Sequence, residues 1–319
     1  MKLTVQIMIQ NNELTIKETL DSLSSLNAQI IVGDIGSTDQ TASICRKQGI
    51  KVTKIDCKQN RSSARNQLAA LSESDWNLHL EPWETIIRGH EELEKLTIPG
   101  TFRCNVIQKT IITKPIRIWH KDKKINYKYP TFETIAGEGQ PTNIYIRANP
   151  PDMTIANLEL LDKWKTDNPV ATEPYYYKAC ILLTQGRYKE FLDVGNHFLF
   201  LEKKMTMAST MIKFYMATVH CYIEKSYQKA IDLLMHCLAH RPLMAEFWCL
   251  LGDIYYAIDQ FDKAKCFYEN AKILGSRRLN SDEWPFDIIK YKSHPDAMIE
   301  SCNALFEKSQ KFKTKSQAH

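Results

Sequence analysis

Short apolar runs alternate with helically spaced segments over the first 80 residues of the chain. Strands are predicted over residues 3–9, 30–32, 51–55 and 76–80. Helices are predicted between them, over residues 15–26, 42–48 and 62–71. Ser62 or Ser63 is expected to cap the third of these helices. Strands and helices that alternate at this interval form a mostly parallel sheet with helices on its faces, so the first half is predicted to be an α/β domain.

A polar turn follows the second predicted strand, in the run I-I-V-G-D-I-G-S-T-D-Q-T over residues 30–41. The strand ends at Asp34, and Asp39 and Thr41 stand where the next helix needs its N-cap. Ligands of parallel sheets bind at the carboxyl ends of the strands, and a carboxylate beside a helix start there suits a nucleotide. An ordinary strand, turn and capped helix is the alternative.

The carboxyl edge of this predicted sheet collects side chains of both charge signs. They are Asn11, Asn12, Glu13, Asp34, Arg65, Asn66, Glu81 and Glu84. Such a mixture suits a nucleotide diphosphate better than a simple anion.

The second half of the chain changes to helical spacing that repeats every 34 residues or so. Matching large and small residues recur in three segments, near 172–205, 211–244 and 245–278, followed by a C-terminal cap. We therefore predict two domains, an α/β domain over 1–150 and an all-α helical-repeat domain over 151–319.

Composition narrows the class of protein. The 319 residues are 44% hydrophobic and 25% charged, as in soluble globular domains. The net charge of +5 is spread along the chain apart from a Lys-rich tail, so no nucleic-acid partner is predicted. Nine scattered cysteines favour reduced thiols and the cytoplasm. No signal peptide or membrane span is expected, because no apolar run approaches ~18 residues.

Four blocks in the first half resemble family 2 glycosyltransferases, in order. They read M-I-Q-N-N-E-L-T-I-K-E-T-L-D-S-L, I-I-V-G-D-I-G-S-T-D-Q-T, S-S-A-R-N-Q-L-A and D-W-N-L-H-L-E-P-W-E. The resemblance implies the GT-A fold, a Rossmann-like sheet that binds a nucleotide sugar. The second half is similar to tetratricopeptide (TPR) repeats, which present a groove for peptides or partner helices.

The resemblance implies nucleotide-binding roles for five residues. Asn12 and Glu13 would border the nucleoside, and Asp34 would contact the uracil or the ribose. Asp39 would cap the following helix or support the same pocket. Arg65 would reach the base or the diphosphate, with a surface ion pair as the alternative.

The metal motif of the family, usually L-D-A-D-E, reads L-E-P-W-E here, with Trp83 at the second acidic place. Three outcomes stay open. Glu81 and Glu84 hold Mg²⁺ or Mn²⁺, cationic side chains such as Arg65 or Arg117 replace the metal, or the site no longer turns over. A plain solvated carboxylate at Glu81 is a further alternative.

The catalytic block is also altered. Relatives have an Arg, an aromatic strand and a His-Glu pair, whereas this chain has Arg117, Trp119, Phe132 and Glu133. The resemblance makes Glu133 the candidate general base that deprotonates an acceptor hydroxyl, with Glu138 as a second candidate. A strand carboxylate paired with a Lys is the alternative for Glu133.

Together these features predict an inverting glycosyltransferase of the hexosyltransferase type. It would move a sugar from a nucleotide diphosphate, expected to be UDP, to a peptide or glycan acceptor, with the repeats recognising the acceptor or a protein partner. The alternative is a catalytically degenerate glycosyltransferase-like domain that acts as a TPR binding platform.

Overall fold

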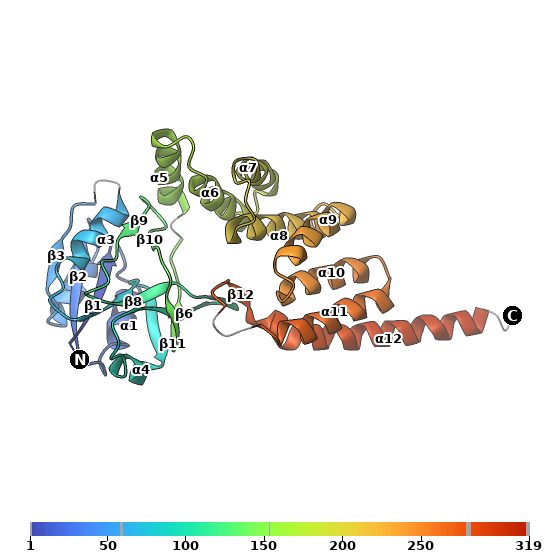
Figure 1. Ribbon diagram of the computed structural model, residues 1–319, viewed down its shortest axis with the longest axis horizontal. Helices are drawn as coiled ribbons and strands as arrows, with labels where there is room; N and C mark the ends of the chain where they lie inside the picture. The colour runs from blue at the N-terminus through green and yellow to red at the C-terminus, as the bar shows by residue number, and fades with distance from the viewer. Residues whose placement is uncertain (1, 58–59, 153, 279–281, 317–319) are drawn as a thin grey trace. The chain divides into compact units, whose positions relative to one another are not determined.

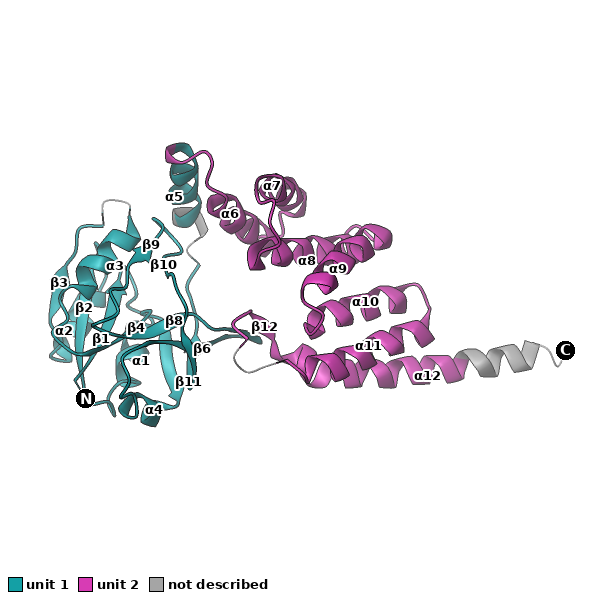
Figure 2. Cartoon of the chain, viewed as in Figure 1, with its two compact units in different colours: residues 1–166 teal, residues 167–319 magenta. Residues whose placement is uncertain are grey.

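The computed structural model describes residues 2–57, 60–152, 154–278 and 282–316. The chain divides into two compact units, Met1–Thr166 and Asp167–His319, shown in different colours in Figure 2.

Unit 1 is built on a mixed sheet (Figure 1). Across it the strands run in the order β7 (Ile111–Thr113), β6 (Thr101–Gln108), β8 (Ile116–His120), β4 (Trp76–Leu80), β1 (Leu3–Ile9), β2 (Ala28–Asp34) and β3 (Val52–Lys54). Strand β11 (Gln140–Ala148) pairs with β6 and with β5 (Glu84–Arg88). Strands β9 (Tyr127–Lys128) and β10 (Thr134–Ile135) form a separate antiparallel pair.

The strands predicted from the sequence are the parallel part of this sheet. Strand β1 pairs in parallel with β2 and β4, and β2 pairs in parallel with β3. The register sets Ile9 beside Asp34 and Asp34 beside Lys54. The carboxyl ends of β1, β2 and β3 therefore lie in one row, where the sequence predicts ligand binding.

The helices of unit 1 lie between strands along the chain, except the last, which follows β11. They are α1 (Ile16–Asp21), α2 (Thr41–Lys47), α3 (Arg61–Ala69), α4 (His90–Glu94) and α5 (Thr154–Asp167). Helix α1 is shorter than predicted, because the chain continues after Asp21 as turns. The cap expected at Ser62 or Ser63 is wrong, since the side chain of Asn60 accepts the hydrogen bond from the Ser63 N–H.

Unit 2 is helical. Its helices are α6 (Glu173–Thr184), α7 (Tyr188–Leu201), α8 (Met207–Tyr222), α9 (Tyr227–His240), α10 (Ala245–Ala257) and α11 (Phe261–Gly275). After them come a short strand β12 (Phe286–Asp287), a 3₁₀ turn η1 (Ile288–Tyr291) and helix α12 (Ser293–Ser316). The predicted fold class, α/β followed by all-α, is confirmed.

The helices of unit 2 pack as consecutive pairs, α6 with α7, α8 with α9 and α10 with α11, and each pair contacts the next along the chain. Small residues allow the close approach within a pair: Gly252 on α10 lies against the buried ring of Tyr268 on α11. Within the described residues, no helix combines the length and apolar character needed to cross a bilayer.

Candidate functional site

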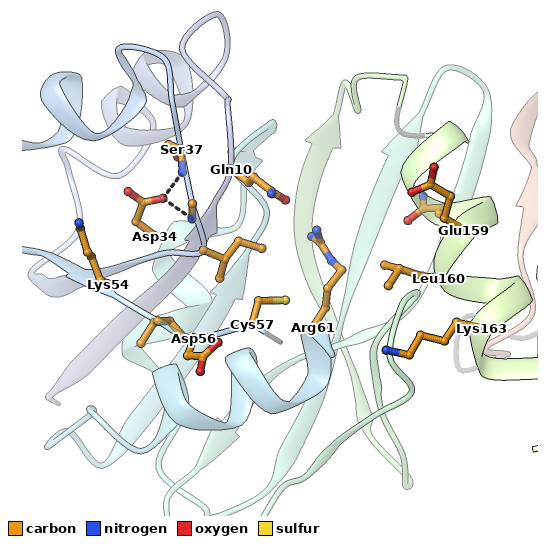
Figure 3. A pocket seen from close by; sticks show the side chains of 14 residues that line it. Gln10, Asp34, Ser37, Lys54, Asp56, Cys57, Arg61, Glu159, Leu160 and Lys163 are labelled. Atoms are coloured by element: carbon orange, nitrogen blue, oxygen red, sulfur yellow. Dashed lines mark hydrogen bonds between the residues drawn. The ribbon is translucent and has the colours of Figure 1, made fainter. Parts of the chain in front are cut away.

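A cavity of about 730 Å³ opens at the carboxyl ends of β2 and β3 (Figure 3). One wall is the turn after β2, with Asp34, Gly36 and Ser37. The floor is the chain leaving β3, which contributes Lys54, Asp56 and Cys57, together with Arg61 at the start of α3. Helix α5 closes the far side with Asn157, Glu159, Leu160 and Lys163. The cavity is thus lined by both carboxylates and cations.

Asp34 shapes the turn that borders this cavity. Its Oδ1 accepts hydrogen bonds from the N–H groups of Gly36 at 3.0 Å and Ser37 at 2.7 Å, drawn as dashed lines in Figure 3. Gly36 has a φ of +115°, a conformation that L-residues rarely adopt. Asp34 thus lies at a strand end beside a tight glycine turn, as predicted, and it lines the cavity.

Hydrogen bonds link the loop after β1, which contains Asn12 and Glu13, to the loop before α2, which contains Asp39. Asp39 Oδ2 accepts from the Glu13 N–H at 3.1 Å, and its Oδ1 accepts from the Thr41 N–H at 2.9 Å. Asn12 Oδ1 accepts from the Gln10 N–H at 2.7 Å, and Glu13 Oε2 accepts from the N–H of Gln40, just before α2, at 3.0 Å. None of the three is among the residues that line the cavity.

Asp39 lies one residue before Gln40, the N-cap residue of α2, whose side chain makes no capping hydrogen bond. Asp39 itself accepts a hydrogen bond from the N–H of Thr41, the first residue of α2, and so supports the start of the helix. Partial burial acts to raise the pKa of Asp39, but the hydrogen bonds from Thr41 and Glu13 outweigh it and hold the pKa below its usual value. The carboxylate of Asp39 is therefore charged at neutral pH, and it holds the loop after β1 against the start of α2.

Arg65 lies at the centre of a buried ion cluster beside the cavity. Its side chain is 3% exposed, and Nη2 lies 2.6 Å from Glu81 Oε1. Its Nε donates to Glu133 Oε1 at 2.8 Å, and Arg61 Nε reaches the same oxygen at 3.2 Å. Burial acts to lower the pKa of Arg65, but the charges of Glu81 and Glu133 raise it above its usual value. The surface ion pair considered for Arg65 is wrong, because the pair is buried.

Glu84 and Arg117 form a second buried ion pair. Arg117 Nη2 lies 2.6 Å from Glu84 Oε1, and Glu84 Oε2 accepts from the Glu81 N–H at 2.9 Å. His79 lies between the two pairs, with Nε2 3.0 Å from Glu81 Oε1. Burial and the charges of Arg65 and Arg117 lower the pKa of His79 to about 3. The imidazole is therefore neutral, and two arginines supply the positive charge here.

The carboxylates expected to hold Mg²⁺ or Mn²⁺ do not fit a divalent cation in this arrangement. Glu81 and Glu84 both face arginines at 2.6 Å. Among the described residues, no three His, Cys, Asp or Glu side chains come together as a group that could hold a metal ion. Glu81 Oε2 is buried without a hydrogen-bond partner, whereas Oε1 of the same carboxylate lies 2.6 Å from Arg65 and 3.9 Å from Arg117. A cation would therefore find a single uncommitted oxygen here, next to two guanidinium groups.

Glu133, the candidate base, follows a strained stretch of backbone. Phe132, at the position of the histidine in relatives, has a φ of +52°, which few L-residues adopt. Glu133 is 6% exposed, and its Oε1 accepts from both Arg61 and Arg65. Two guanidinium groups therefore contact the same carboxylate oxygen. The expected alternative of a Lys partner is wrong, since the partners are arginines. Glu138 is exposed on the loop before β11.

Sequence reasoning missed Lys54, Arg61 and the cavity residues of α5. Lys54 is the last residue of β3, so the rule that places ligands at strand ends would have found it. Arg61 is the first residue of α3, but the predicted helix began at residue 62, so Arg61 was not considered as part of it. No local pattern links α5 to the sheet edge, because it follows β3 by roughly 100 residues of chain.

Residues 4–80 match the family model described as Glycosyl transferase family 2. This segment is similar to that family. It spans β1 to β4 and so includes Asp34 and Arg65, but it stops one residue before Glu81. The family predicted for the first half is confirmed. No curated protein matches the chain by sequence.

Solved structures similar to the chain cover its helical part. MamA 41-end from Desulfovibrio magneticus RS-1 is 22% identical, with 51% of this chain and 88% of that one covered and a TM-score of 0.38. The Sgt2 TPR domain from Aspergillus fumigatus is 11% identical, with 44% and 82% covered and a TM-score of 0.35. The first TPR of Spaghetti (RPAP3), bound to the HSP90 peptide SRMEEVD, is 12% identical, with 43% and 93% covered and a TM-score of 0.33.

Proposed function

We propose that the chain is a glycosyltransferase that takes a sugar from a nucleotide diphosphate, a UDP-sugar, and passes it to a peptide or glycan acceptor. The family 2 segment supplies the nucleotide-binding half of unit 1. In a direct displacement of the UDP leaving group by an acceptor hydroxyl, the anomeric configuration inverts. Nine cysteines without a pairing pattern in the sequence favour a reducing compartment, the cytoplasm.

The observation that carries this proposal is the cavity at the ends of β2 and β3. Its volume of about 730 Å³ lies within the range of small-molecule sites. Asp34 can accept hydrogen bonds from a uracil N–H or from ribose hydroxyls. Lys54, Arg61 and Lys163 bring positive charge to the same space, which suits a diphosphate. Asn12, Glu13 and Asp39 would contribute by holding the turn in place.

Glu133 is the base of the proposed displacement. It lies in the cluster next to Arg61, which also lines the cavity. As a base it would take the proton of the acceptor hydroxyl while the nucleotide diphosphate leaves. Helix pairs of the TPR kind bind extended or helical segments, so we assign recognition of the acceptor or of a protein partner to unit 2.

A second candidate function is a nucleotide-binding platform without turnover. It is favoured by one observation: Arg65 holds both Glu81 and Glu133, the residues expected to act in metal binding and in catalysis. While Arg65 occupies both carboxylates, neither Glu81 nor Glu133 is available to bind a metal ion or to accept a proton.

Two measurements separate these functions. Thermal unfolding of the full chain with UDP should show stabilisation, because a ligand that binds the native state raises the unfolding temperature, and Asp34→Ala should abolish the shift. Incubation with UDP-sugars should then release UDP. No shift with any nucleotide would overturn both candidates, whereas binding of UDP without hydrolysis or transfer would favour the platform.

A further inference from the structure

Three carboxylates and three guanidinium groups balance one another at the position where the family holds a metal ion. The carboxylates belong to Glu81, Glu84 and Glu133, and the guanidinium groups to Arg61, Arg65 and Arg117. The pairs are close: 2.6 Å for Arg65 with Glu81, 2.6 Å for Arg117 with Glu84 and 2.8 Å for Arg65 with Glu133. His79 adds no charge at neutral pH. The formal charge of the cluster is therefore zero.

A divalent cation would upset this balance. It would bring two further positive charges next to Arg65 and Arg117, whose side chains are 3% and 11% exposed and so poorly screened by water. Its ligands would have to come from Glu81 and Glu84, which would then leave those arginines without partners. Breaking a buried ion pair in this way is costly, because the remaining charge stays buried.

Arg61 links this balanced cluster to the cavity. It is both a lining residue of the cavity and a partner of Glu133. In Figure 3 its side chain rises into the space between the Asp34 turn and helix α5. Its hydrogen bond to Glu133, at 3.2 Å, is longer than the 2.8 Å bond from Arg65, and at 12% its side chain is more exposed than that of Arg65. Arg61 can therefore change partner without leaving Glu133 unpaired.

We infer that Arg61 binds the diphosphate of the nucleotide directly, so that nucleotide binding needs no divalent cation. This inference rests on the proposed function, because it concerns the same cavity. A guanidinium fork matches two phosphate oxygens and supplies charge where a metal ion would otherwise do so. Lys54 also lines the cavity and adds a second positive charge.

The exchange also affects Glu133. When Arg61 turns to phosphate, Glu133 keeps its hydrogen bond from Arg65 and loses the one from Arg61. Occupation of the cavity by the diphosphate would therefore leave one of the two guanidinium contacts on the Oε1 of Glu133.

Isothermal titration of UDP into the full chain tests this inference, in buffer with EDTA and in buffer with Mn²⁺. The expected result is the same dissociation constant within about twofold in both buffers. Arg61→Gln should weaken UDP by roughly tenfold to a hundredfold, as expected for loss of a charge-assisted hydrogen bond, and Arg61→Lys should weaken it less. Uridine, which has no phosphate, should bind Arg61→Gln and the unmodified chain alike.

Arg46→Gln is the matched control, because it removes the same charge from an exposed residue of α2 outside the cavity lining. It should leave UDP binding unchanged. Binding of UDP only with Mn²⁺ would overturn the inference and leave the proposed function standing. An equal loss of UDP and uridine affinity in Arg61→Gln would overturn the role of Arg61 in phosphate binding. Absence of UDP binding in both buffers would overturn the proposed function itself.

Discussion

Gly252 and Tyr268 approach so closely that a Cβ atom on Gly252 would lie 2.5 Å from Cε1 of the tyrosine ring. The ring has little room to move away, because it is fully buried and its hydroxyl donates to Asp253 Oδ1 at 2.6 Å. Glycine at this position is therefore a condition for the packing of α10 against α11.

Gly252→Ala should destabilise unit 2 by about 1–3 kcal/mol, the usual cost of overpacking a filled core. Urea unfolding followed by far-UV circular dichroism measures this. Gly195→Ala is the control, since its Cβ would lie 3.4 Å from Ile212 Cγ2, an ordinary contact. That variant should be neutral or gain up to about 1 kcal/mol from the better helix propensity of alanine. Equal effects of the two substitutions would contradict the steric argument.

Arg65→Met should lower the free energy of unfolding of unit 1 by about 3–5 kcal/mol, because it leaves Glu81 and Glu133 buried without their main partner. Adding Glu81→Gln should recover part of that loss, which a double-mutant cycle in urea would measure. Lys17→Gln breaks an ion pair of the same 2.6 Å length between side chains 68% and 52% exposed, and should cost far less, because water screens an exposed pair. A comparable cost at both sites would show that burial does not set the strength of these pairs.

Asp34 serves both the turn and the proposed ligand, and two substitutions separate these roles. Asp34→Ala removes the acceptor of the Gly36 and Ser37 N–H groups and should cost about 1–2 kcal/mol of stability. Asp34→Asn keeps an acceptor oxygen and should stay within about 0.5 kcal/mol of the unmodified chain. Both should reduce the thermal shift with UDP. A normal shift in Asp34→Asn would show that the turn matters for the ligand and the carboxylate charge does not.

Asp253 should make unit 2 sensitive to acid. Burial acts to raise the pKa of Asp253, but a hydrogen bond from His294, the charge of Lys290 and the hydroxyls of Tyr222 and Tyr268 outweigh it and lower the pKa. The carboxylate thus titrates at a lower pH in the folded chain than in the unfolded chain, where its pKa is about 3.9. Its contribution is fully present above that value and is lost as the pH falls through the folded pKa.

The free energy of unfolding of unit 2, measured in urea between pH 7 and pH 3, should therefore fall more steeply below about pH 4 in the unmodified chain than in Asp253→Asn. Asp253→Asn should also cost about 2 kcal/mol at pH 7, where charged hydrogen bonds are replaced by neutral ones. Tyr222→Phe removes one of the hydrogen-bond donors to Asp253. Its free energy of unfolding should therefore fall less steeply with acid than that of the unmodified chain, but more steeply than that of Asp253→Asn. Identical slopes in all three proteins would assign the acid sensitivity to other groups.

Much of the fold could be predicted because it follows from periodicity. Apolar runs such as 30–32 form strands of the sheet, and the helical spacing that contains Gly252 and Tyr268 marks a helix pair. The strand-end rule also placed Asp34, Arg65 and Glu81 at one edge of the sheet, where the structure has them.

The partners of the charged residues could not be predicted in the same way. Arg65 and Glu133 are 68 residues apart, and which carboxylate an arginine meets depends on side-chain conformations that no spacing rule contains. The cap of α3 was misplaced because two serines beside Asn60 are equally good caps. The part of the cavity formed by α5 depends on chain that lies far along the sequence.

The consecutive packing of helix pairs in unit 2 bears on how such a chain can evolve. Because each pair contacts its neighbours along the chain, duplication or deletion of about 34 residues changes the length of the array by one pair and creates or removes one similar interface. The strands that form the cavity, β2 and β3, precede the array in the gene. Descendants of this protein can therefore vary what the array recognises while inheriting the cavity unchanged.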